Sequence, residues 1–169
     1  KGTAQSEMYK AKYKITRDTY LVKILSSRNE KQNAYSLAKK TLTLANKYEQ
    51  TDYSLILARH LFTHFSLFSP NKRKKERINE EIINLEKIQK EEILAERYYN
   101  EVSFIYLTKK TKFDEKELLK MKNYISELSV IQKEINSFSF NQHTYNLYIC
   151  LLVFSRSHLR ALQAFSRCS

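Results

Sequence analysis

Two histidines, His60 and His64, are four residues apart and would share one face of a helix. Two metal ligands can use that spacing. The residues between them are Leu61-Phe62-Thr63, so the glutamate of the His-Glu-x-x-His zinc motif is missing. No cluster of Cys, Asp or Glu is close in sequence. We therefore interpret the pair as partly buried histidines among aromatic residues and predict no metal site.

The sequence contains no recognisable catalytic motif. Its one glycine, Gly2, rules out a glycine-rich phosphate loop and a Gly-x-Ser-x-Gly nucleophile elbow. The acidic pairs Glu80-Glu81 and Glu91-Glu92 consist of adjacent residues, which point to different helix faces. Neither Cys150 nor Cys168 has an obvious histidine partner. We predict a non-enzymatic protein with no catalytic residues and no cofactor.

Two basic runs are candidates for binding an anionic partner. The first consists of Lys72, Arg73, Lys74, Lys75 and Arg77, and the second of Lys109, Lys110 and Lys112. The first run falls in the opening turn of an expected helix, where the helix dipole disfavours cations. It could therefore contact phosphate or an acidic partner. A solvated loop and helix start is the simpler interpretation and stays open.

Aromatic residues supply a third candidate. Tyr98, Tyr99 and Asn100 could line a concave groove and hydrogen-bond a peptide backbone, although aromatics at helical spacing are more often core residues. Residues 9–14 interleave tyrosines with lysines, a pattern that could stack bases. An amphipathic end helix is the interpretation that we prefer for this segment.

The composition indicates which elements must position these side chains. The 169 residues include one Gly and one Pro, where average usage would give roughly twelve and eight. A β-rich chain needs both residues at its turns. We therefore predict an all-α protein in which residues 1–169 form a single helical-repeat domain.

The formal charge of +12 comes from 30 basic and 18 acidic residues. Most of the basic residues are lysines, and the chain is also rich in Asn, Ile, Tyr and Phe, all of which have AT-rich codons. We therefore discount the charge as evidence for nucleic acid. Two cysteines make no disulfide framework, so we expect a reducing, cytoplasmic location. The longest apolar run has eight residues, whereas a membrane span needs about twenty.

Capping residues predict helix starts at regular intervals. Candidate N-caps are Asn29, Asn71, Asp114 and Ser157, spaced by 42, 43 and 43 residues. An apolar stripe keeps the same register. Ile78, Ile82, Leu85 and Ile88 recur 43 residues later as Met121, Ile125, Leu128 and Ile131. The chain therefore repeats a helical unit of about 43 residues.

A second class of more apolar helices is expected between these. Their ranges are about 4–25, 52–68, 91–109 and 141–154, and the first would bury Tyr13, Tyr20, Leu21 and Ile24. Inner and outer helices would alternate about three and a half times and stack into a solenoid. Residues 86–91 must then contain a break, but no Gly, Pro or Asn marks it. A single helix over residues 72–109 is the alternative.

The segments NAYSLAKKTL (33–42) and HLRALQAF (158–165) both look like the outer helix of a repeat, with small and apolar residues among charges. On these segments the chain resembles a degenerate tetratricopeptide-type (TPR-like) repeat protein. The resemblance implies a right-handed α-α superhelix that binds proteins or peptides. The family repeat has 34 residues, and a period near 43 also suits HEAT-type helical repeats.

The leading functional hypothesis is a helical-repeat module that binds a protein or peptide partner. The chain begins without Met and ends in the middle of its last copy, so we expect a fragment of a longer regulatory protein. The first alternative is a helical repeat that binds nucleic acid through a basic surface. The second is a structural or dimerising segment, which would expose an apolar patch near Leu162 and Phe165. The oligomeric state stays open.

Overall fold

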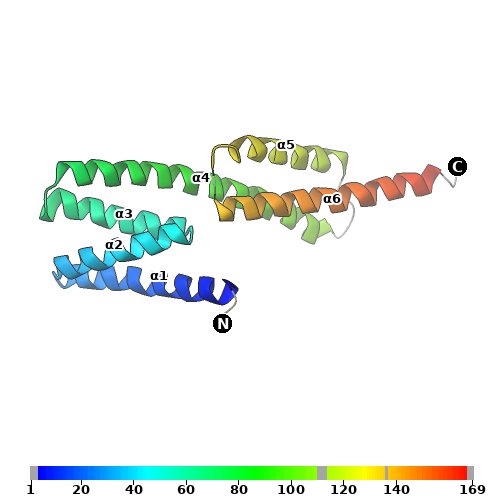
Figure 1. The fold of residues 1–169 in the computed structure, drawn as a ribbon. Coiled ribbons are helices and arrows are strands. Elements are labelled where there is room, and N and C mark those ends of the chain that lie inside the picture. The colour runs from blue at the N-terminus through cyan, green and yellow to red at the C-terminus, as the bar shows by residue number, and fades with distance from the viewer. Residues whose placement is uncertain (1–3, 110–113, 136, 167–169) are drawn as a thin grey trace. The chain divides into compact units, whose positions relative to one another are not determined.

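The computed structural model describes the backbone of residues 4–109, 114–135 and 137–166, and side chains within 6–108, 114–135 and 137–153. Every regular element in these ranges is helical (Figure 1). The elements are α1 (Ala4–Ser27), α2 (Lys31–Lys47), α3 (Thr51–Thr63), the π-helical turn η1 (His64–Phe68), α4 (Lys72–Lys109), α5 (Glu115–Ile131) and α6 (Phe138–Ser166). The all-α prediction is confirmed. The chain divides into two compact units, Lys1–Gln89 and Lys90–Ser169.

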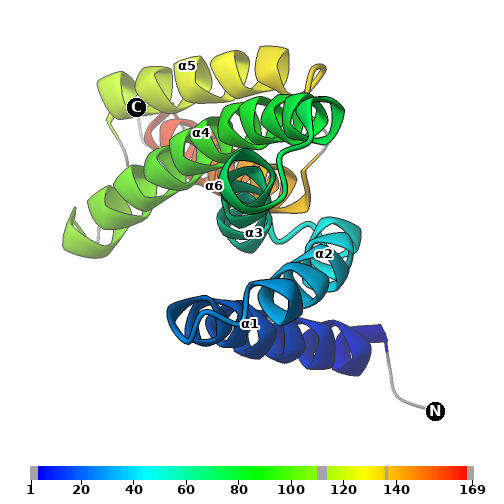
Figure 2. The ribbon, with the colours of Figure 1, turned by 90° about the vertical axis from the view of Figure 1, so that its left-hand side faces the viewer.

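In the first unit, α2 packs against both α1 and α3, and it lies between them in both views (Figures 1 and 2). Ile15, Leu57, Ile78 and their neighbours form one apolar core from all four helices. Polar pairs hold the first half of α4 against α2 and α3. They are Asn46 with Glu81 at 2.7 Å, Arg59 with Glu86 at 2.8 Å and Gln89 with Asp52 at 2.7 Å.

Two turns of the same type reverse the chain after α1 and after α2. Asn29 and Glu49 have positive φ angles of 64° and 50°. At the first turn, Asn29 N donates to Ser26 O and Glu30 N donates to Leu25 O, which is the Schellman pattern. Asn29 therefore ends α1, and Glu30 is the N-cap of α2. The prediction that Asn29 caps the following helix is wrong, because the left-handed conformation that Asn tolerates is used to close the preceding one.

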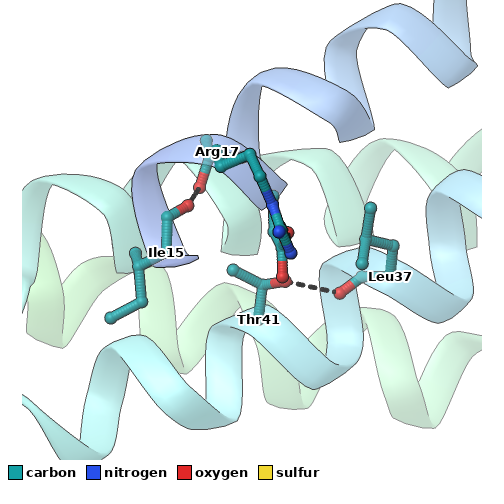
Figure 3. Close-up of polar contacts among 6 residues, drawn as sticks. Ile15, Arg17, Leu37 and Thr41 are labelled. Carbon is teal, nitrogen blue, oxygen red and sulfur yellow. Dashed lines mark hydrogen bonds and ion pairs between the residues drawn. The ribbon is translucent and has the colours of Figure 1, made fainter. Parts of the chain in front are cut away.

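The buried face of α1 also differs from the prediction. Tyr13, Tyr20, Leu21 and Ile24 are exposed, and α1 instead buries Ala11, Ile15, Asp18, Thr19 and Val22. Small and polar residues on this face let α1 approach α2. Figure 3 shows Thr41 of α2, whose hydroxyl donates to Leu37 O at 2.9 Å. Such bonds satisfy buried hydroxyls inside a helix interface.

In the second unit, α5 packs against α6 and is tied to the second half of α4 by Tyr98, whose hydroxyl donates to Glu127 at 2.7 Å. Met121, Ile125 and Leu128 are buried, as are their counterparts Ile78, Ile82 and Leu85 in the first unit. Three of the four positions of the stripe that repeats after 43 residues are therefore buried in both units, and the fourth pair, Ile88 and Ile131, is half-buried.

Two expected helix boundaries are absent. The helix α4 runs unbroken through residues 86–91, so the alternative of one helix over 72–109 is correct. All six residues there are Glu, Lys, Ile or Gln, which have no strong tendency to end a helix. The start expected at Ser157 is wrong, because α6 continues from Phe138 to Ser166. A serine caps a helix only where the preceding chain leaves helical geometry.

Candidate functional site

The first unit contains a groove of about 330 Å³ between α2, the junction of α3 with η1, and the start of α4. We call it the unit-1 groove. Its apolar floor consists of Tyr35, Leu42, Leu61, Phe65 and Ile78. Four of these side chains are buried, and Tyr35 packs against the same core. The floor is therefore part of the core.

The rim of the unit-1 groove is polar, and half of its residues are basic. It consists of Lys39, Thr43, Asn46, Lys74, Arg77 and Glu81. Glu81 is the one carboxylate among the residues that line the groove, and its Oε1 accepts a hydrogen bond from Asn46 at 2.7 Å. Three cations therefore surround an apolar floor, and the single anion is already hydrogen-bonded.

Lysines beside the groove rest on phenylalanine rings. The contacts are Lys31 Nζ to the Phe68 ring at 4.0 Å, Lys74 Nζ to Phe65 at 5.6 Å and Lys75 Nζ to Phe62 at 5.3 Å. Each pair is a cation–π contact, which favours a fixed position for the charge. The rings come from the end of α3 and from η1, so the lysines of α2 and α4 converge on that junction.

The α4 N-terminus is capped as predicted. Asn71 Oδ1 accepts from the backbone N–H of Lys74 at 2.9 Å. The first turn of α4 contains no acidic residue, so lysine and arginine stand at the positive end of the helix dipole. An anionic partner would relieve that repulsion.

The structure describes the side chains of the first predicted basic run but not those of the second. Lys72, Arg73, Lys74, Lys75 and Arg77 are all exposed, and Lys74 and Arg77 reach the unit-1 groove. Lys72 lies 3.9 Å from Glu76, its neighbour one turn later. In the second run, the side chain of Lys109 and both Lys110 and Lys112 lie outside the described residues. The role of the second run therefore stays a prediction.

His60 and His64 lie at the end of α3 and the start of η1. Burial lowers the pKa of His64, and burial together with the charge of His64 lowers the pKa of His60. Within the described part of the chain, no three His, Cys, Asp or Glu side chains are grouped to hold a metal ion. The imidazole of His64 instead stacks on Tyr35, one of the groove residues.

Tyr98 and Tyr99 pack against the core of the second unit. The Tyr98 ring is stacked on Tyr124, with centroids 3.8 Å apart and planes 9° apart. Burial, and then the hydrogen bond to Glu127, raises the pKa of Tyr98. Asn100 is exposed. The role of these three residues in partner binding stays a prediction, and the tyrosine rings have a structural role in any case.

The sequence did not predict the floor of the unit-1 groove. Leu42, Leu61 and Ile78 are ordinary stripe residues, and nothing in their spacing distinguishes a groove floor from a closed core. The one available signal was the basic run that starts at Lys72, which marks the rim.

No protein-family model matches this chain, and no curated protein or solved structure is significantly similar to it. No helix within the described ranges is long and apolar enough to cross a membrane.

Proposed function

We propose that this chain is a non-enzymatic helical module that binds an acidic peptide segment of a protein partner in the unit-1 groove. The observation that carries the proposal is the combination of an apolar floor with the cations Lys39, Lys74 and Arg77. Apolar contact with the floor contributes to binding, and charges at the rim select the partner and speed association. A segment with one or two apolar anchors flanked by Asp or Glu has the matching chemistry.

We also propose that the helices belong to a TPR-like right-handed superhelix. Two observations support this. The stripe that repeats after 43 residues is buried in both α4 and α5. Short Schellman turns connect α1 to α2 and α2 to α3, and such turns make successive helical hairpins. A HEAT-type arrangement has the same period and would serve the same function.

The experiment uses a fluorescein-labelled peptide in which Phe and Leu alternate with Asp and Glu. Its binding to the full chain is measured by fluorescence anisotropy. Lys74→Glu and Arg77→Glu should each weaken binding by about tenfold or more, because a like charge would then face the acidic peptide. Thr43→Trp should also weaken binding, since Thr43 lines the groove and a large ring would fill it.

The matched control is Arg73→Glu, which makes the same charge change one residue from Lys74 without lining the groove. It should change the affinity by less than about threefold, the range expected for a screened surface charge. An equal loss in all three charge variants would mean that net charge, and not the groove, attracts the peptide. Displacement of the peptide by an oligonucleotide, with no effect of Thr43→Trp, would favour a nucleic-acid partner at this site and contradict the proposal.

A further inference from the structure

The outward face of α1 carries a row of exposed tyrosines. Tyr9, Tyr13 and Tyr20 are 66%, 71% and 60% exposed, and Ile24 continues the row. Their spacings of four, seven and four residues place them along one side of the helix, opposite the face that packs on α2. Within the described residues their hydroxyls make no hydrogen bond, and the exposed rings lie outside the core. We call these four residues the α1 tyrosine row.

Cations flank the row on both sides. They are Lys10, Lys12, Lys14, Arg17 and Lys23, all exposed. The acidic residues of α1 are Glu7 and Asp18, and Asp18 is buried, where its carboxylate pairs with Arg17 at 2.7 Å. Lys23 Nζ lies 5.6 Å from the centroid of the Tyr20 ring. The surface around the row is therefore positive, with four lysines available to an outside anion.

The spacing of the rings along α1 favours a single-stranded over a double-stranded nucleic acid. With a rise of about 1.5 Å per residue, Tyr9 and Tyr13 are about 6 Å apart along the axis, and Tyr13 and Tyr20 about 10.5 Å. A base-stacked strand advances about 3.4 Å per nucleotide. Neighbouring bases must therefore separate before each can stack on its own tyrosine, which a single strand does easily and a duplex does not.

We propose that the α1 tyrosine row binds single-stranded nucleic acid, with bases stacked on Tyr9, Tyr13 and Tyr20 and phosphates bound by the flanking lysines. Charge complementarity and the exposed aromatic faces both favour this ligand. The proposal does not depend on the unit-1 groove.

The test measures fluorescence anisotropy of labelled 12-nucleotide oligouridine and oligothymidine with the full chain. Each of Tyr9→Ala, Tyr13→Ala and Tyr20→Ala should weaken binding by about five- to hundredfold, the usual range for loss of one stacked base. The corresponding Phe variants keep the ring and should bind within about threefold of the parent. If four phosphates are contacted, affinity should fall by about 50-fold between roughly 50 and 200 mM salt. Comparing oligouridine with oligothymidine shows whether RNA or DNA is preferred.

Tyr145→Ala is the matched control, because Tyr145 is 60% exposed and lies on α6. It should leave binding unchanged. The proposal is wrong if a duplex of the same length binds as tightly as the single strand, or if the three Ala variants bind like the parent. Binding of α1 to anionic phosphatidylserine vesicles without oligonucleotide binding would also overturn it. Self-association would overturn it as well. The decisive result would be a concentration-dependent dimer, detected by sedimentation, that is lost in the Tyr13→Ala variant, together with no oligonucleotide binding.

Discussion

The imidazole of His64 lies face to face with the phenol ring of Tyr35, with ring centroids 4.4 Å apart and planes 16° apart. The rings of Phe65 and Phe68 meet the same imidazole edge-on, at 5.7 and 6.3 Å. This aromatic surrounding disfavours the charged form of His64, because the imidazolium would lose hydration. The neutral ring thus supports Tyr35, which lines the unit-1 groove.

Stability should consequently fall in mild acid. The pKa values of His60 and His64 are lowered in the folded chain from the ordinary value of 6.5, so below about pH 6.5 the unfolded chain binds more protons than the folded one. The free energy of unfolding should therefore decrease as the pH falls below 6.5, by at most about 1.4 kcal/mol per pH unit for each histidine. Urea unfolding followed by circular dichroism between pH 7.5 and 5.5 measures this. If the double variant His60→Gln/His64→Gln loses stability in acid as much as the parent does, groups other than these histidines cause the loss.

Replacing Glu49 by Gly should stabilise the first unit. Glu49 has a φ of 50°, a left-handed conformation that costs a residue with a Cβ about 1 kcal/mol relative to Gly. Glu49→Gly should raise the free energy of unfolding by about 0.5–1 kcal/mol. Asn29→Gly should change it less, because Asn tolerates this conformation well. Denaturant titration of both variants gives the comparison, and a loss of stability in Glu49→Gly would refute the strain argument.

The capping box of α5 should contribute to the stability of the second unit. Asp114 Oδ1 accepts from Glu117 N at 2.8 Å, and Glu117 Oε2 accepts from Asp114 N at 3.0 Å. Asp114→Ala removes the side-chain acceptor and should cost about 1 kcal/mol. Asp114→Asn keeps an acceptor and should cost much less. Thermal unfolding of the two variants tests the expectation, which fails if they are equally destabilised.

The pair Arg17 and Asp18 should be worth more than an ordinary surface ion pair. The Asp18 side chain is 6% exposed and the Arg17 side chain 59% exposed, so one charge is buried and the other solvated. Arg17→Ala leaves the buried carboxylate without its guanidinium partner and should cost about 1–2 kcal/mol, a value reduced for the exposure of Arg17. Adding Asp18→Asn should recover part of this loss. A double-mutant cycle by urea unfolding measures the coupling, and strict additivity would show that the pair contributes nothing.

Much of the fold could be predicted because it depends on local chemistry. The scarcity of Gly and Pro requires helices whatever their packing. The Asn71 cap and the Asp114 capping box bond to backbone groups three residues away, so neighbouring residues are sufficient to specify them. The stripe from Ile78 and its copy from Met121 follow the helical period, which selects the buried face directly.

The tertiary structure decided which helix faces pack together and which residues line the groove. Tyr13 and Tyr20 fit an apolar stripe as well as Ile15 and Val22 do, and only the packing of α1 against its neighbouring helices determined which side turned inward. The unit-1 groove likewise combines side chains from α2, α3, η1 and α4 that share no sequence pattern. Capping and periodicity act over a few residues, whereas a groove and an exposed face depend on how distant helices fit together.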